Sequence, residues 1–120
     1  RHPLEGNPAY EGLEIQIIDD DTKRWRLEAF QLSGALYHAV PPSMRATRAA
    51  GTWESMEITA SGKRILVHLN GFPVVDADLD LETERIGEAK SLKDRPRTGH
   101  IGLQSYGTGI EFRNFRVKRA

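Results

Sequence analysis

The sequence predicts an all-β domain of antiparallel strands, and three observations indicate this class. Apolar and polar residues alternate in several short runs, as they do in strands that bury one face. Asn70 and Gly71 separate two such runs, and this dipeptide is a strong hairpin signal. The chain has 120 residues, which suits one core. Residues 1–120 are therefore expected to form a single domain.

The first third of the chain contains two predicted strands and one predicted helix. Residues 12–18 form the first strand, because apolar side chains occupy every second position. An acidic triplet ends it, and loosely helical apolar spacing in residues 23–32 predicts a short helix. Residues 34–40 form the next strand, which closes at Pro41 and Pro42 because proline cannot continue a central ladder.

The middle of the chain predicts three strands joined by two tight turns, the first at Ser61 and Gly62 and the second at Asn70 and Gly71. The central run places three residues toward the core: Ile65, Val67 and Leu69. Leu66 and His68 then face away, and His68 is expected to be a surface histidine. Residues 82–98 form a long polar connection with room for one helical turn.

Residues 99–117 predict a further hairpin, with Gly107 and Gly109 at its turn. Apolar residues alternate on one face of each run. His100 and Gln104 occupy the opposite, polar face of the first run. We expect the functional site on that polar face.

Composition excludes several classes of function. Basic and acidic residues number seventeen each, so the net charge gives no reason to expect a nucleic acid as partner. The absence of cysteine excludes disulfides and thiolate chemistry. No apolar run approaches the roughly twenty residues that span a bilayer, and the N-terminal residues lack a signal-peptide core. Neither a membrane partner nor a nucleotide cofactor is expected.

Four sequence blocks occur in a fixed order: YEGLEIQIIDDD, GALYHAVPP, W..MEITASGKRILVHLNG and RPRTGHIGLQSYGTGIEFRNFRV. Together they resemble the 3-keto-disaccharide hydrolase domain family, whose members are antiparallel β-sandwiches of the concanavalin A-like or LamG-like jelly-roll type. The resemblance covers nearly the whole chain. It implies that these residues are the C-terminal part of such a sandwich, without its first strands. Exposed strand edges would then favour a homo-oligomer.

The family resemblance also implies a function. Such a protein is an extracellular or periplasmic bacterial enzyme that cleaves 3-keto-glycosides by removing the proton on carbon 2, eliminating the glycosidic oxygen and adding water. Its partner is an oxidised disaccharide or glycoside. A non-catalytic, lectin-like carbohydrate-binding module is the alternative, because the same polar sheet would serve both. A third hypothesis is an interaction domain that pairs by strand addition.

Candidate site residues follow from the blocks and from shared strand faces. Glu14 and Gln16 lie about 7 Å apart on one face from the rise per residue, although an ordinary solvated face explains the pair as well. We expect Glu14 or His100 as the base and Arg95 as the stabiliser of the enolate. Four further candidates are expected to bind the sugar: Gln16, Tyr37, Arg97 and Gln104. Asp19 is expected to bind a divalent metal, with turn capping as the alternative.

Overall fold

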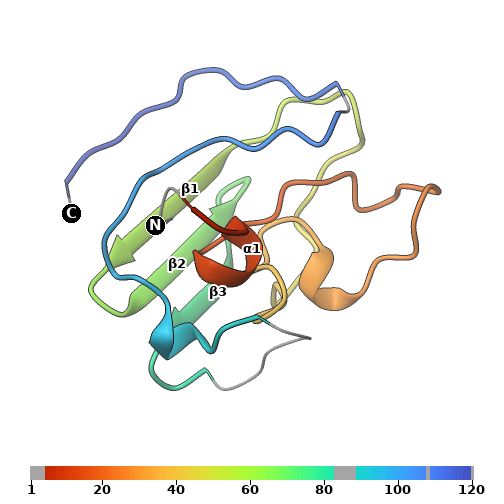
Figure 1. The fold of residues 1–120 in the computed structure, drawn as a ribbon. Helices are drawn as coiled ribbons and strands as arrows, with labels where there is room; N and C mark the ends of the chain where they lie inside the picture. The colour runs from red at the N-terminus through yellow and green to blue at the C-terminus, as the bar shows by residue number, and fades with distance from the viewer. Residues whose placement is uncertain (1–4, 83–88, 108, 120) are drawn as a thin grey trace.

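A three-stranded antiparallel sheet lies at the centre of the molecule (Figure 1). The computed structural model describes residues 5–82, 89–107 and 109–119. The strands follow the chain order, β1 (Met56–Ser61), β2 (Arg64–Leu69) and β3 (Phe72–Asp78). Within the described residues, three single turns of helix accompany the strands: α1 (Pro8–Glu11), η1 (Ala29–Gln31) and η2 (Leu92–Asp94). No helix in the described ranges is both long and apolar enough to cross a membrane.

The hairpin turn predicted at Asn70 and Gly71 is confirmed, whereas the first turn lies one residue later than predicted, at Gly62 and Lys63, because Ser61 ends β1 and pairs with Arg64. Asn70 and Gly71 have φ angles of 53° and 84°, the left-handed values that a two-residue hairpin turn requires. Asn70 also fixes the preceding loop, because its amide nitrogen donates to the carbonyl of Ser55 at 2.8 Å. Its side-chain Nδ2 donates to the carbonyl of Ala46, also at 2.8 Å. The turn therefore anchors the start of β1 as well as reversing the chain.

The core lies on one face of this sheet. Ile65, Val67 and Leu69 of β2 are buried, as the alternation predicts, whereas the side chains between them are half-exposed. Leu36 from the loop before β1 and Leu92 from η2 are each 1% exposed and belong to the same cluster. The sheet is therefore covered by irregular segments, and these segments carry most of the candidate site residues.

The strands predicted for residues 12–18 and 34–40 are wrong as regular elements. Only isolated bridges occur there, between Ile15 and Leu36 and within the second segment. The two segments do lie side by side, as neighbouring strands would. His38 has a φ of 60°, which reverses the chain and prevents a continuous ladder.

The predicted helix over residues 23–32 is also wrong, since only the three-residue η1 forms there. Within residues 82–98, η2 supplies the expected helical turn, and residues 83–88 lie outside the described part.

The predicted hairpin over residues 99–117 is wrong too. Its described residues contain no strand, and Figure 1 draws them as two extended runs outside the sheet. Ile101 is 64% exposed and Val117 is 66% exposed, so the alternating apolar face is not buried. An alternating pattern forms a strand only where a neighbour pairs with its backbone and covers its apolar face. In the described residues, His100 forms a single bridge, and no ladder or buried apolar face continues from it.

Gly34 offers a test of how the loop packs on the sheet. Its φ is 87°, and a Cβ added there would lie 2.8 Å from Cγ2 of Val74 on β3. Gly34→Ala should therefore lower the free energy of unfolding through left-handed strain of about 1–2 kcal/mol and overpacking of about 1–3 kcal/mol. Denaturant unfolding measures the loss.

Gly71→Ala is the matched control, because Gly71 has a similar φ of 84° but nothing within 4 Å of its added Cβ. It should show the strain alone. Combining Gly34→Ala with Val74→Ala should recover the overpacking part, which appears as favourable coupling of about 1 kcal/mol or more in a double-mutant cycle. Additive losses would show that the contact with Val74 does not constrain the loop.

Candidate active site

Arg95 is a buried clamp between two segments that are distant in the sequence. Its side chain sits just after η2, and the residue is 3% exposed. Nε donates to the carbonyl of Lys90 at 2.9 Å, and Nη1 donates to the carbonyls of Gly12 at 2.9 Å and Ala9 at 3.3 Å. Hydrogen bonds from a charged donor are stronger than neutral ones, so these contacts hold the guanidinium in one orientation.

The clamp leaves one guanidinium nitrogen unused. Nη2 of Arg95 is buried without a hydrogen-bond partner, and so is Oε2 of Glu14. No salt bridge within 4.0 Å joins the two groups. Buried polar atoms in native proteins are nearly always paired, with protein or with water. The unpaired donor and the unpaired acceptor, which carry opposite charges, are therefore candidates to bind a polar ligand or an ordered water.

Burial dominates the electrostatics of this pair. Desolvation raises the pKa of the Glu14 carboxyl, and the positive charge of Arg95 opposes that rise without cancelling it. Desolvation likewise lowers the pKa of the Arg95 guanidinium, with the charge of Glu14 opposing. A carboxylate with a raised pKa is a stronger base than an ordinary surface glutamate, which suits it to proton abstraction.

Backbone hydrogen bonds fix Glu14 beside the second loop segment. The amide nitrogen of Tyr37 donates to the carbonyl of Glu14 at 3.0 Å, and that of Gln16 donates to the carbonyl of Ala35 at 3.0 Å. The structure therefore brings together three of the predicted site residues, Glu14, Tyr37 and Arg95. It does so through paired loops and the Arg95 clamp, without the regular strands that the sequence predicts.

His38 belongs to this centre and was not among the predicted site residues. Its ring centroid lies 4.2 Å from that of Tyr37 and 5.8 Å from that of Tyr10. Its Nδ1 is buried without a hydrogen-bond partner. The predicted strand put Tyr37 and His38 on opposite faces, because consecutive strand residues alternate. The positive φ of His38 breaks that alternation and lets the two rings meet.

Gln16 and Arg97 have local partners. Gln16 accepts a hydrogen bond from the amide of Ile17 through Oε1 at 3.1 Å. Arg97 forms a salt bridge through Nη2 with Asp80, just beyond β3, while its Nη1 is buried and unpaired. Gln16 is adjacent to the Glu14 backbone, whereas no contact ties Arg97 to Glu14. The sugar-binding roles of both residues stay predictions.

His100 and Gln104 lie in the exposed C-terminal segment. Among the described residues, no hydrogen bond, ion pair or ring contact joins either side chain to Glu14. The sequence analysis relied on a strand to aim them into the site, and that strand does not form. Their predicted roles as base and sugar ligand have no structural support in this conformation.

The acidic triplet is engaged in turn contacts. Oδ1 of Asp19 accepts the amide of Asp21 at 3.0 Å, and Oδ1 of Asp20 accepts the amide of Ser33 at 2.8 Å. Within the described ranges, no group of three or more histidine, aspartate or glutamate side chains could hold a metal ion. The turn-capping alternative accounts for Asp19, and its metal role stays a prediction.

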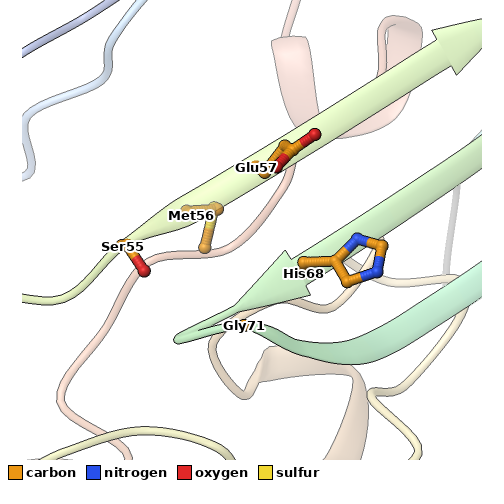
Figure 2. Close-up of a pocket in the computed structure, with 5 residues that line it drawn as sticks. All are labelled: Ser55, Met56, Glu57, His68 and Gly71. Carbon is orange, nitrogen blue, oxygen red and sulfur yellow. The ribbon is translucent and has the colours of Figure 1, made fainter.

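A separate hollow of about 470 Å³ lies on the outer face of the sheet near the Asn70 turn (Figure 2). Its lining comes from the start of β1, the end of β2 and the following turn: Ser55, Met56, Glu57, His68 and Gly71. None of the buried unpaired atoms belongs to it. We place the candidate site at the Glu14 and Arg95 centre, because charges there lack partners, whereas Glu57 is exposed to water.

Comparison with known proteins identifies the family. The model of the 3-keto-alpha-glucoside-1,2-lyase-like domain matches residues 1–118. The chain therefore belongs to this family, as its sequence blocks indicate. No curated protein matches it.

A solved structure supports the fold class. The crystal structure of a candidate glycosyl hydrolase from Parabacteroides distasonis is similar to this chain, with a TM-score of 0.66 and 24% sequence identity. The similarity covers 72% of this chain and 50% of that protein. The chain thus spans about half the length of its structural relative. Together with the antiparallel sheet, this similarity confirms the all-β class.

The raised pKa of Glu14 predicts a specific dependence of stability on pH. The folded state holds the Glu14 proton more tightly than the unfolded state, whose pKa is near the ordinary 4.5. Between 4.5 and the raised folded value, the unfolded state releases its proton first, so the contribution of this group to stability falls as pH increases.

Glu14→Gln replaces the carboxylate by a neutral amide and so removes the cost of burying its charge. The variant should therefore unfold at a higher denaturant concentration than the wild type at pH 7. The difference should disappear below about pH 4, where Glu14 is protonated in both the folded and the unfolded wild type. Urea unfolding at several pH values measures it. A wild type that is more stable than the variant at pH 7 would mean that attraction to Arg95 outweighs desolvation.

Proposed function

We propose that this chain cleaves glycosides that carry a ketone at carbon 3 of the sugar ring. The observation that carries the proposal is that one carboxylate oxygen of Glu14 and one guanidinium nitrogen of Arg95 are both buried without a hydrogen-bond partner, while the two charges interact electrostatically. Family membership and the fold similarity to a candidate glycosyl hydrolase agree with glycoside chemistry. The ketone, the linkage and the mechanism are part of the proposal.

A 3-keto sugar needs the two groups that this centre offers. The ketone acidifies the hydrogen on carbon 2, so a single carboxylate can remove it as a base. The negative charge then moves to the ketone oxygen, where a fixed cationic donor stabilises it. Elimination of the glycosidic oxygen from carbon 1 gives an enone, and water adds to carbon 1 afterwards. Paired carboxylates at glycosidase spacing are unnecessary for this route.

In this proposal Glu14 is the base and Nη2 of Arg95 donates to the enolate oxygen. Arg95 suits that role because its other nitrogens are already bound to backbone carbonyls, so it reorganises little during the reaction. Tyr37 and Gln16 are adjacent to Glu14 along the paired loops and would orient the sugar hydroxyls. Arg97 and Gln104 could contact a longer glycoside only from other parts of the surface.

The proposed reaction leaves an isotopic signature. Incubation with a 3-keto disaccharide in deuterium oxide should release the second sugar and place deuterium on carbon 2 of the keto sugar, because the proton is removed and later replaced from solvent. The parent disaccharide, which has no ketone, should remain intact. Mass spectrometry and proton NMR measure both results. Release of sugar without deuterium at carbon 2 would contradict the elimination.

Glu14→Gln should lower kcat/KM by about 10²–10⁴, the usual contribution of a positioned general base. Glu57→Gln is the matched control, because Glu57 is an exposed carboxylate on β1, a strand that makes none of the Arg95 hydrogen bonds, and it should retain wild-type kinetics. Equal activity of both variants would remove Glu14 from the mechanism. Equal loss in both would point to the hollow of Figure 2 instead.

A carbohydrate-binding module is the second candidate, and one observation favours it. Trp25 and Tyr106 are 42% and 80% exposed, and their ring centroids lie 6.4 Å apart. Exposed aromatic faces can stack on sugar rings without any chemistry at carbon 1. Saturable binding of both the 3-keto disaccharide and its parent, with no product from either, would favour this function over catalysis.

A further inference from the structure

His38 holds an unfavourable backbone conformation. Its φ is 60°, in the left-handed region where the Cβ of most residues crowds the backbone. Glycine would adopt this conformation without strain. Nothing in the turn itself therefore requires a histidine, and strained backbone of this kind is concentrated at functional sites.

No hydrogen bond from the His38 side chain to another described residue offsets the strain of its positive φ. The described residues give His38 no hydrogen bond from its side chain, and its Nδ1 is buried. Its ring contacts are with two tyrosines: Tyr37 at 4.2 Å with an interplanar angle of 54°, and Tyr10 at 5.8 Å and 63°. These rings hold the imidazole in place and leave a nitrogen available for a ligand atom or an ordered water.

The same contacts place His38 at the Glu14 and Arg95 centre. Tyr37, the preceding residue, binds the carbonyl of Glu14 through its amide. In the sequence, Tyr10 lies between Ala9 and Gly12, whose carbonyls both accept hydrogen bonds from Arg95. The imidazole therefore packs against Tyr10 in the segment that the guanidinium fixes and against Tyr37, whose backbone is hydrogen-bonded to Glu14.

We propose that His38 is the acid of this centre and gives its proton to the departing glycosidic oxygen. The inference rests on the function proposed above and adds the group that elimination still needs. Imidazole exchanges a proton near neutral pH, which suits it to protonate a leaving alkoxide and later to accept a proton from water. The exposed His100, which the sequence suggested, has no contact with the site.

The proton balance closes with these two residues. Glu14 takes the proton from carbon 2, and the electron pair forms the enolate. The enolate electrons then form the double bond between carbons 1 and 2, the ketone reforms, and the bond from carbon 1 to the glycosidic oxygen breaks as the His38 imidazolium protonates that oxygen. Neutral His38 next takes a proton from water as the water oxygen bonds to carbon 1. Glu14 exchanges its proton with solvent and then protonates carbon 2, so the hydrogen there comes from water.

His38→Gly separates an acid from a structural residue. Glycine relieves the positive φ, so the variant should keep or raise the unfolding midpoint of the wild type. Its kcat on a 3-keto disaccharide should nevertheless fall by about 10²–10⁴. On the 4-nitrophenyl 3-keto glucoside, whose leaving group needs no proton, its kcat should stay within about threefold of wild type. Added imidazole should restore part of the activity on the disaccharide.

Two controls accompany this comparison. Asn114→Gly removes a side chain at a similar φ of 55° in the exposed C-terminal segment, and His68→Asn removes a histidine on the outer face of the sheet. Both should retain wild-type kinetics on both substrates. Should His38→Gly fail to fold, His38→Asn provides the same comparison, since asparagine tolerates the left-handed region.

The outcomes distinguish the two proposals. If the wild type is active and the His38→Gly variant is equally active on both substrates, the acid role is overturned. The proposed function then still stands. Equal loss on both substrates without rescue by imidazole also overturns it, since that result indicates a positioning role. A wild type with no activity on either substrate overturns the proposed function and the acid role together.

Discussion

The arrangement of the site depends on the Arg95 clamp. One guanidinium binds carbonyls from the N-terminal segment and from the segment around η2, and it thereby joins the two irregular regions that cover the sheet. A lysine could not replace it, because an ammonium lacks the planar fork that reaches several carbonyls at once. The same guanidinium keeps one nitrogen without a hydrogen-bond partner, and its charge acts on the Glu14 carboxyl. The structural role and the proposed chemical role thus fall on a single side chain.

Forming this centre costs free energy, because it removes charged groups from water. Glu14 and Arg95 both lose contact with water, and neither gains a direct ion pair that would offset the loss. His38 adds backbone strain and a partnerless ring nitrogen. Such features persist only where surrounding contacts enforce them, and here the paired loops and the Arg95 hydrogen bonds do so. A site with unpaired charges is ready to bind a polar transition state with little reorganisation.

The sheet carries more apolar surface than the described residues cover. Ile58 of β1 lies opposite Val67 and so shares the core face, yet it remains 49% exposed. Phe115 in the C-terminal segment is 60% exposed. Large uncovered apolar surfaces on soluble proteins usually mark places where further structure or a partner packs. The expected association through strand edges stays a prediction that this surface makes physically reasonable.

The sequence by itself determined the class of fold, the family and the central hairpins. Alternation in β2 and the Asn70 turn are local signals, because neighbouring residues create them and hydrogen bonds within the hairpin satisfy them. Glu14, Tyr37 and Arg95 were among the residues that the sequence analysis named, and their roles stay predictions. The rest was decided by tertiary structure. The C-terminal alternation lacks a strand to pair with. The positive φ of His38 breaks the predicted strand, which would have put its ring on the face opposite Tyr37. The burial of Arg95 depends on distant carbonyls. Such long-range contacts leave no periodic trace in the sequence.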